Sequence, residues 1–298
     1  MNVEQSCGLL GYSKQAYYKS LHHHEARAFD EYLMLELIRQ KRRIWKKGSG
    51  RNLLASLKDD LIKHGIKIGR DKFFELLRAH NLLIKRKSRR AITTNSYHHF
   101  HRYPNLIREL IPHMPNQVWV SDITYVWVQR EACFMYLFLV TDMYSRKIIG
   151  YCISRSLKAL GAIEALKMAI RQANRLSMVQ TIHHSDRGIQ YCCNAYTNLL
   201  KSNKINISMT ENSDPLENAI AERINRTLKE EFMDDYKSGY KSISIATTEI
   251  KRNIQFYNQI RPHRSIEMLT PNQAHLRTGY LERKWKNYYK INVLNLVN

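Results

Sequence analysis

The chain has few acidic residues for its length. Its 298 residues contain 26 Asp and Glu against 48 Lys and Arg, which gives a formal charge of +22. This excess is too large for an ordinary enzyme that acts on small neutral substrates. It indicates a polyanionic partner, either nucleic acid or an anionic membrane surface.

Long hydrophobic runs are also lacking. The longest apolar stretch, residues 132–140, spans nine residues and is too short to cross a bilayer. The first residues, MNVEQSCGLL, lack the charged start and the long apolar core of a signal peptide. We therefore expect no membrane partner, which leaves nucleic acid.

The five cysteines form no CxxC pair and no even framework. This pattern argues against a zinc knuckle and against a disulfide scaffold, and it favours a reducing cytoplasm as the location. Hydrophobic residues make up 44% of the chain, which is enough for a sizeable core.

The N-terminal part is predicted to be helical. Residues 1–30 form a helical segment that is broken before Ser13, a residue suited to cap the following helix. It reads equally well as the end of a small helix-turn-helix or as a peripheral helix pair. Residues 31–90 contain three predicted helices, at 31–45, 52–64 and 71–81, joined by glycine-bearing turns. That arrangement is typical of a helix-turn-helix domain.

Charge favours DNA binding by this region over a merely solvated helical bundle. Between Arg39 and Arg90 there are 18 Lys and Arg against four Asp and Glu. Such a surface binds mainly phosphates, so its affinity for DNA should fall steeply with salt. Residues 91–115 read as a basic linker that lies along a phosphate backbone. The tail, residues 281–298, interleaves basic and aromatic residues and suits single-strand or phosphate contact.

Residues 116–280 show a different pattern, which predicts an α/β domain. Three strands with short connections form an antiparallel meander, and alternating helices and strands follow. This order indicates a ribonuclease H-like fold, a mixed five-stranded sheet flanked by helices, here preceded by the all-α helix-turn-helix region. The strands are expected at 117–128, 133–142, 147–154, 178–184 and 206–209, and the helices at 157–176, 191–201, after the loop at 210–217, and at about 244–257.

Three carboxylates occupy informative positions in this domain. Asp122 lies in the middle of a strand that is apolar on both faces, where an ionised carboxylate is costly unless it is paired or bound to a metal. Asp186 follows a strand after a crossover helix, where an α/β sheet places its site. Glu222 lies on a helix whose face it shares with Asn218, with Arg226 or Asn225, and with Lys229. Each acid could instead belong to a buried salt bridge.

Two other acids compete with these three. Asp142 precedes a turn, so we expect it to cap the turn or to pair with Arg146. Glu217 stands at the start of the helix that carries Glu222, so we expect it to be a helix cap.

Five segments resemble the catalytic half of bacterial insertion-sequence-three family transposases, the group most similar to retroviral integrases. The resemblance covers residues 116–275 in order, and residues 39–81 resemble the helix-turn-helix of that family. The five segments are WVSDITY (119–125), LVTDMYSRKIIGY (139–151), HSDRGIQY (184–191), SMTENSDPLENAIAERINRTLKEE (208–231) and FYNQIRPHRSIEMLTPNQ (256–273).

The resemblance implies a DDE triad in which Asp122, Asp186 and Glu222 are both catalytic residues and metal ligands. The interval of 35 residues between Asp186 and Glu222 is typical of these enzymes. Lys229 matches a basic residue thought to touch DNA near the active site. Phosphodiester transfer by two divalent ions needs hard oxygen ligands, so Mg2+ or Mn2+, two ions per site, is the expected cofactor.

The expected function is therefore DNA transposition: cleavage of the element ends and strand transfer into other DNA. The family suggests copying through a one-strand-bridged and then circular intermediate. The different-class alternative is a non-catalytic DNA-binding regulator or inhibitory transposase derivative, and a third is a nuclease acting on RNA–DNA hybrids. The candidate DNA contacts are Lys229, Asn218, Arg226, Arg187, Arg261, His263, Arg42, Arg43, Arg51, Lys85, Arg86, Lys87, Arg89 and Arg90.

The expected partners are double-stranded DNA, as terminal repeats and as target, and further copies of the chain on that DNA. Family members are usually made as a fusion to an upstream frame. This chain shows no such leader and no sustained heptad, so it resembles the downstream (OrfB-type) product, with the upstream-frame protein or a frameshift fusion as a possible partner. The expected location is the bacterial cytoplasm, in association with the nucleoid when DNA is bound. The loop at 211–215 lacks the glycine common in relatives and is expected to be stiffer.

Overall fold

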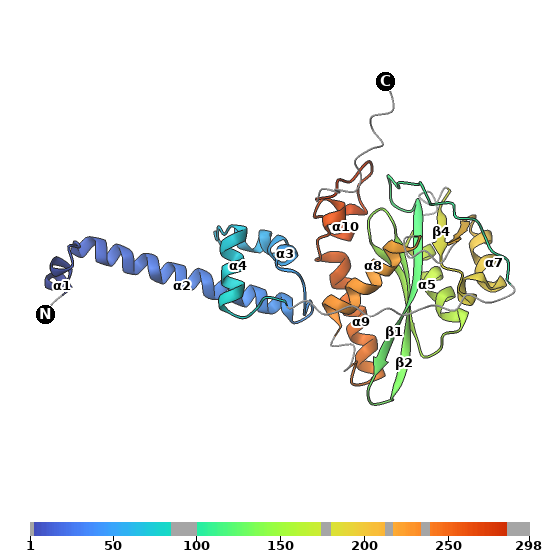
Figure 1. Cartoon of the computed structure of the whole chain (residues 1–298), viewed down its shortest axis with the longest axis horizontal. Helices are drawn as coiled ribbons and strands as arrows, with labels where there is room; N and C mark the ends of the chain where they lie inside the picture. The colour runs from blue at the N-terminus through green and yellow to red at the C-terminus, as the bar shows by residue number, and fades with distance from the viewer. Residues whose placement is uncertain (1–2, 85–99, 174–179, 212–216, 234–238, 285–298) are drawn as a thin grey trace, which may run out of the picture.

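The computed structural model describes residues 3–84, 100–173, 180–211, 217–233 and 239–284. These residues form a helical N-terminal unit and an α/β domain. The long second helix of the N-terminal unit extends away from the α/β domain (Figure 1). None of the described helices combines the length and the apolar character that a bilayer-spanning segment needs.

The N-terminal unit contains α1 (Val3–Leu9), α2 (Lys14–Arg42), α3 (Gly50–Lys63) and α4 (Arg70–Ala79). Ser13 caps α2 as expected, because its hydroxyl accepts a hydrogen bond from the Ala16 N–H at 3.1 Å. No glycine or proline interrupts the chain from there to Arg42, so the helix continues. The helix expected to begin at residue 31 is therefore part of α2, and the boundary placed at residue 30 falls inside it.

A small hydrophobic core holds α2, α3 and α4 together. Ile38, Leu53, Leu57, Phe73 and Leu77 are fully buried in it. The three helices predicted within residues 31–90 are thus present. The glycine-bearing turn between α3 and α4 allows the apolar faces of both helices to pack on α2.

The α/β domain is built on a mixed five-stranded sheet with the order β3-β2-β1-β4-β5. The first three strands form the predicted antiparallel meander, and β4 and β5 run parallel to β1. This order is the expected ribonuclease H-like arrangement. The bounds are β1 Val118–Val128, β2 Cys133–Asp142, β3 Ile148–Ser154, β4 Ile182–Ser185 and β5 Asn206–Met209.

Helices cover both faces of the sheet (Figure 1). One face packs against α5, α6 and α7 around Trp119 and Phe138, and the other packs against α8 and α9 around Val126 and Leu137. Gly150 lets β3 approach α5, since a Cβ there would lie 2.1 Å from the Ala165 carbonyl oxygen. The bounds are α5 Ala159–Gln172, α6 Ile189–Cys192, α7 Asn194–Ser202, α8 Ala219–Thr227, a π-helical turn η2 Leu228–Phe232, α9 Ile243–Gln259, η3 Arg264–Ile266 and α10 Pro271–Ala274.

Two elements differ from the prediction for backbone reasons. The helix expected at 191–201 is divided into α6 and α7, because Cys193 adopts an extended conformation (φ −66°, ψ 148°). The fourth strand begins at Ile182, and Gln180, two residues earlier, adopts a left-handed conformation (φ 65°) that is incompatible with a strand. Residues 178 and 179 of the expected strand lie outside the described residues.

Trp45 joins the N-terminal unit to the α/β domain. It lies between α2 and α3 in sequence, but its fully buried ring packs in the hydrophobic core of the α/β domain. The ring centroid is 6.2 Å from that of Phe232 and 5.9 Å from that of Phe256. Gly48 accommodates this ring, since a Cβ at that position would lie 2.3 Å from it. The core of the α/β domain is thus completed by a residue from outside it.

We predict that Trp45→Ala lowers the free energy of unfolding by about 3–5 kcal/mol, the usual cost of emptying a large buried aromatic site. Urea denaturation followed by circular dichroism measures the change. Tyr32→Ala is the matched control, because Tyr32 is exposed on α2 and its loss should change stability by less than about 0.5 kcal/mol. Equal effects of the two variants would contradict the burial of Trp45.

Candidate active site

The sheet register brings the first two candidate acids together. Strands β1 and β4 are parallel, and Val120 is paired with His184. Asp122, two residues further along β1, therefore lies beside Asp186, which directly follows β4. Glu222 lies in the first turn of α8, a helix that packs against β1. Three segments that are far apart in the sequence thus meet at one end of the β1–β4 pair.

Hydrogen bonds fix the two aspartates. The Asp122 carboxylate accepts from the Ile123 N–H and from the Asn225 side-chain amide, both at 2.8 Å. The Asp186 carboxylate accepts from the Gly188 N–H at 3.0 Å, which closes the turn between β4 and α6. The Glu222 side chain is exposed.

The three acids of the site interact electrostatically. Burial raises the pKa of Asp122 to about 7, and repulsion from Asp186 and, more weakly, from Glu222 adds to the increase. Burial also raises the pKa of Glu222, an effect that Arg226 opposes and Asp186 reinforces. Each of the three acids therefore interacts electrostatically with at least one other acid of the group.

The donor set fits a hard divalent cation. Carboxylate oxygens are the ligands that Mg2+ prefers, and a cation would relieve the repulsion among the three acids. Over the residues that the structure describes, no three His, Cys, Asp or Glu side chains gather closely enough to surround one ion. The fit thus rests on the ligand type and on the charge.

Asn218 and Asn225 attach α8 to β1 on either side of Glu222. The Asn218 side-chain amide donates to the Ser121 carbonyl oxygen at 3.1 Å, and the Asn225 amide donates to Asp122. The sequence analysis named either Arg226 or Asn225 as the residue that shares a helix face with Glu222. The structure turns Asn225 inward and leaves Arg226 exposed near Glu222. The signal for Asn225 was a polar residue at a buried position of an amphipathic helix.

Comparisons with known proteins agree with this geometry. Residues 112–215 and residues 203–271 each match a family described as an integrase core domain. An uncharacterized 31 kDa protein of insertion element IS600 from Shigella sonnei is 32% identical over 270 residues, which cover 89% of this chain and 95% of that protein. Transposase InsF for insertion sequence IS3A from Escherichia coli is 34% identical over 160 residues, 53% of this chain and 54% of that protein. The chain belongs to the insertion-sequence-three family of transposases.

Solved structures share the fold of this transposase at low identity. The HTLV-2 integrase catalytic core domain in complex with magnesium is 16% identical, with a TM-score of 0.39, over 55% of this chain and 99% of that chain. The simian T-cell lymphotropic virus intasome gives 17% identity and a TM-score of 0.44, over 79% of this chain and 76% of that chain. Both scores are below 0.5, so the fold assignment rests on the strand order and the family matches.

The base of the loop that precedes α8 in the transposase is held by charged residues. The Glu217 carboxylate accepts from the Glu211 N–H at 2.6 Å, and Arg108 bonds Glu211 and lies 3.7 Å from Glu217. Glu217 is therefore not the helix cap that was expected: the N-cap position is Asn218, and Glu217 closes the loop instead. Residues 212–216 of this loop lie outside the described residues. The expected stiffness of the loop therefore stays a prediction.

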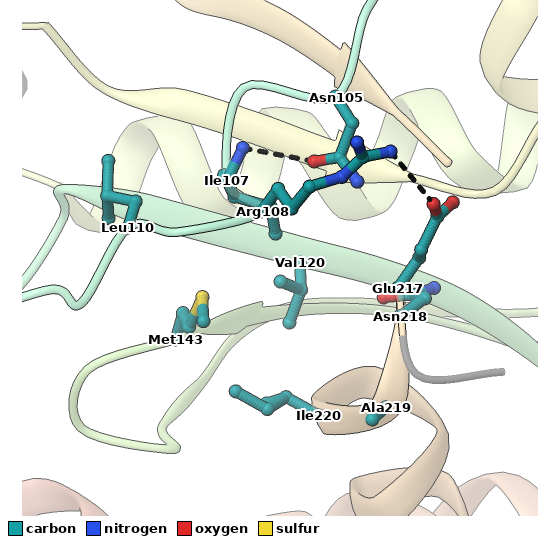
Figure 2. Close-up of a pocket in the computed structure, with 10 residues that line it drawn as sticks. All are labelled: Asn105, Ile107, Arg108, Leu110, Val120, Met143, Glu217, Asn218, Ala219 and Ile220. Atoms are coloured by element: carbon teal, nitrogen blue, oxygen red, sulfur yellow. Dashed lines mark hydrogen bonds and ion pairs between the residues drawn. The ribbon is translucent and has the colours of Figure 1, made fainter. Parts of the chain in front are cut away.

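A cavity of about 530 Å³ lies beside this loop base and the start of α8 (Figure 2). Figure 2 shows Arg108 and Glu217 facing each other at its rim, with Val120, Met143 and Ile220 along its apolar wall. No sequence signal pointed to Arg108, which lies in the predicted linker.

Three of the candidate DNA contacts are buried: Asn218, described above, Arg261 and His263. Arg261 donates two hydrogen bonds to the Glu231 carboxylate, at 2.8 and 2.6 Å, and lies over the Tyr257 ring. His263 is also buried, and burial lowers its pKa well below its usual value, so it is neutral. Only 7% of Arg261 and 9% of His263 is exposed, and their role as DNA contacts stays a prediction.

The other basic candidates differ in exposure. Arg43, Arg51 and Arg226 are exposed, whereas Arg42, Arg187 and Lys229 are half-buried. Lys85, Arg86, Lys87, Arg89 and Arg90 lie outside the described residues.

Lys229 is half-buried and interacts electrostatically with Asp122, the first of the three candidate acids. It lines a small hollow with Tyr125, Trp127 and Tyr240. Burial lowers its pKa, and the charge of Asp122 opposes that decrease. Lys229 therefore contributes positive charge next to the first aspartate, whether or not DNA is bound.

Asp142 has a structural role. Its carboxylate, which is fully buried, accepts from the Asn116 N–H and from the N–H and hydroxyl of Ser145. The expectation that it caps the turn after β2 is thereby confirmed.

The raised pKa of Asp122 predicts a pH-dependent stability of the metal-free transposase. The folded protein binds the Asp122 proton up to about pH 7, while the unfolded chain releases it near pH 4, so the contribution of Asp122 to the free energy of unfolding should fall as pH rises between these values. The buried histidines His183, His184 and His263, whose pKa values burial lowers, contribute in the opposite sense, so the effect of Asp122 is measured as the difference between wild type and Asp122→Asn. Asp122→Asn should abolish this loss and stabilise the metal-free protein at pH 8 by a few kcal/mol, on the order of 1.4 per pKa unit.

Urea denaturation at pH 5 and pH 8, in the presence of a chelator, measures the effect. Asp59→Asn serves as the control, because Asp59 is exposed on α3 and its replacement should act equally at both pH values. A stability difference between wild type and Asp122→Asn that is the same at pH 5 and pH 8 would contradict the raised pKa of Asp122.

Proposed function

We propose that this transposase cuts the ends of its own insertion element and joins them to other DNA with Asp122, Asp186 and Glu222 as metal ligands. The observation that carries the proposal is the electrostatic interaction of Asp122, on β1, with Asp186, which follows β4, and with Glu222, on α8, which together with burial raises the pKa of Asp122 to about 7. A buried acid with a raised pKa is costly to stability and is typical of a functional site.

The site would hold two Mg2+ or Mn2+ ions, as the HTLV-2 integrase core holds magnesium. When bound, the ions activate the attacking oxygen and stabilise the leaving oxygen of a phosphodiester exchange. The chain's own residues supply placement: Asn225 orients Asp122, the Gly188 turn orients Asp186, and Asn218 holds the start of α8 against β1.

The exchange occurs in two steps of the same kind. Water first attacks the phosphodiester at an element end, which leaves a DNA 3′-hydroxyl. That hydroxyl then attacks a phosphodiester of the target, so one P–O bond forms as another breaks, and the target strand leaves with its own 3′-hydroxyl. The three acids suffice for this chemistry, since a protein nucleophile is not required.

The N-terminal unit would bind the terminal repeats of the element. Arg43 and Arg51 are exposed on this unit, at the end of α2 and the start of α3. Pairing two ends requires further copies of the chain on the DNA, as in the intasome, and the upstream-frame protein or a fusion with it would be an additional partner. The location that follows is the bacterial cytoplasm, with the protein on the nucleoid when DNA is bound.

We predict that Glu222→Gln reduces joining of element-end oligonucleotides by at least about 10³-fold while it leaves DNA binding intact, because the loss is confined to the metal site. Strand transfer on labelled oligonucleotides with Mg2+ or Mn2+ measures this. Glu217→Gln is the rival variant and should retain joining within about tenfold. Joining by a folded Glu222→Gln protein would exclude Glu222 as the third ligand.

Replacement of Arg43 and Arg51 by alanine should weaken DNA binding and reduce the slope of log K against log salt by about 2, because two phosphate contacts are lost. Fluorescence anisotropy at several salt concentrations measures the slope. A matched double variant at the other end of α3 and in the turn after it, Lys63→Ala with Lys67→Ala, shows whether the loss is specific. Salt-sensitive binding by a wild-type protein that never joins ends would favour the regulator over the transposase.

A further inference from the structure

The Glu231 carboxylate binds two parts of the chain at once. One oxygen accepts from the Trp45 indole N–H at 2.6 Å and from Arg261 Nε at 2.8 Å, and the other accepts from Arg261 Nη2 at 2.6 Å. The Glu231 carbonyl oxygen also accepts from the Lys47 N–H at 2.9 Å. Side chain and backbone of one residue therefore hold the α2–α3 connection on the α/β domain.

Glu231 lies at the far end of the rod that carries Glu222. Helix α8 passes without a break into the π-helical turn η2, so Glu222 and Glu231 belong to one continuous helical segment, Ala219–Phe232. Hydrogen bonds from Asn218 and Asn225 fix the rod near the active site, and Glu231 and Phe232 fix its other end. A helix transmits a shift at one end to the other because its backbone hydrogen bonds keep it stiff.

Trp45 belongs to the basic unit on the other side of this contact. It lies three residues after α2 ends and five before α3 begins. Arg42, the last residue of α2, is half-buried, and the charge of Glu231 opposes the lowering of its pKa by burial. The α2–α3 connection thus contacts the Glu231 end of the helical rod that carries Glu222. A displacement of the N-terminal unit, for example by bound DNA, would therefore act on that end of the rod.

We infer that Trp45 is a positioning residue for Glu222, acting through Glu231 and the α8–η2 rod, so that the basic N-terminal unit sets the geometry of the catalytic site. The inference rests on the proposed role of Glu222 as a metal ligand. It makes the N-terminal unit part of the active enzyme, beyond any role in binding DNA.

Trp45→Phe in the full chain tests this, with Trp119→Phe as the matched control. Both tryptophans are fully buried and both donate one indole hydrogen bond, Trp119 to Asn116 at 3.1 Å, but Trp119 packs on the opposite face of the sheet. The two variants should lose similar stability. Only Trp45→Phe should lower the joining rate by about tenfold or more, since small displacements of catalytic groups have effects of this size.

A metal readout separates positioning from general destabilisation. The Mg2+ concentration that gives half of the maximal joining rate, and the rise in melting temperature that Mg2+ produces, should both change in Trp45→Phe and stay within about twofold of wild type in Trp119→Phe. Glu231→Gln should repeat the Trp45→Phe pattern, whereas Glu230→Gln, one residue earlier and exposed, should not.

Equal losses in the two tryptophan variants, or an unchanged metal response in both Trp45→Phe and Glu231→Gln, would overturn the inference. Glu222→Gln in the same assay distinguishes this failure from failure of the proposed function. If Glu222→Gln joins DNA, the triad is wrong. If it is inactive while Trp45→Phe behaves like wild type, only the positioning role is wrong.

Discussion

The half-buried carboxylate of Glu231 is the contact on which the arrangement of this transposase depends. It neutralises Arg261, accepts the indole N–H of Trp45 and ends the helical rod that carries Glu222. Removal of one partner from such a buried pair leaves a charge without compensation and costs about 3–5 kcal/mol. The N-terminal unit, the catalytic helix and the C-terminal part of the fold therefore share one electrostatic centre.

The active site shows the opposite electrostatic arrangement. Asp122, Asp186 and Glu222 repel one another, and Lys229 and Arg226 offset only part of that repulsion. Under the proposed function, a cation and a phosphate would relieve this repulsion. The β1–β4 pairing and the asparagine contacts of α8 hold the acids in place.

Much of the fold followed from local patterns. The β1–β2–β3 meander, the parallel β4 and β5 and the three helices of the N-terminal unit were predicted, because alternation and apolar spacing are local properties. The long α2 and the break at Cys193 were not, since a helix continues or stops according to backbone conformation and packing that residue types only bias. The burial of Arg261 and His263 was not predicted either, because the residue types of a basic turn are the same whether the turn faces DNA or a glutamate of the same chain.

The sequence by itself indicated the polyanionic partner, through the charge of +22, and predicted the three acids, through their spacing, their strand and helix positions and the family resemblance. Only the tertiary structure decided that Asn225 and not Arg226 contacts Asp122, that Glu217 closes a loop, and that Trp45 completes a core more than 70 residues away in sequence. The physical reason is that charge and periodicity are carried by neighbouring residues, whereas a buried hydrogen bond or ion pair joins groups whose separation along the chain carries no signal.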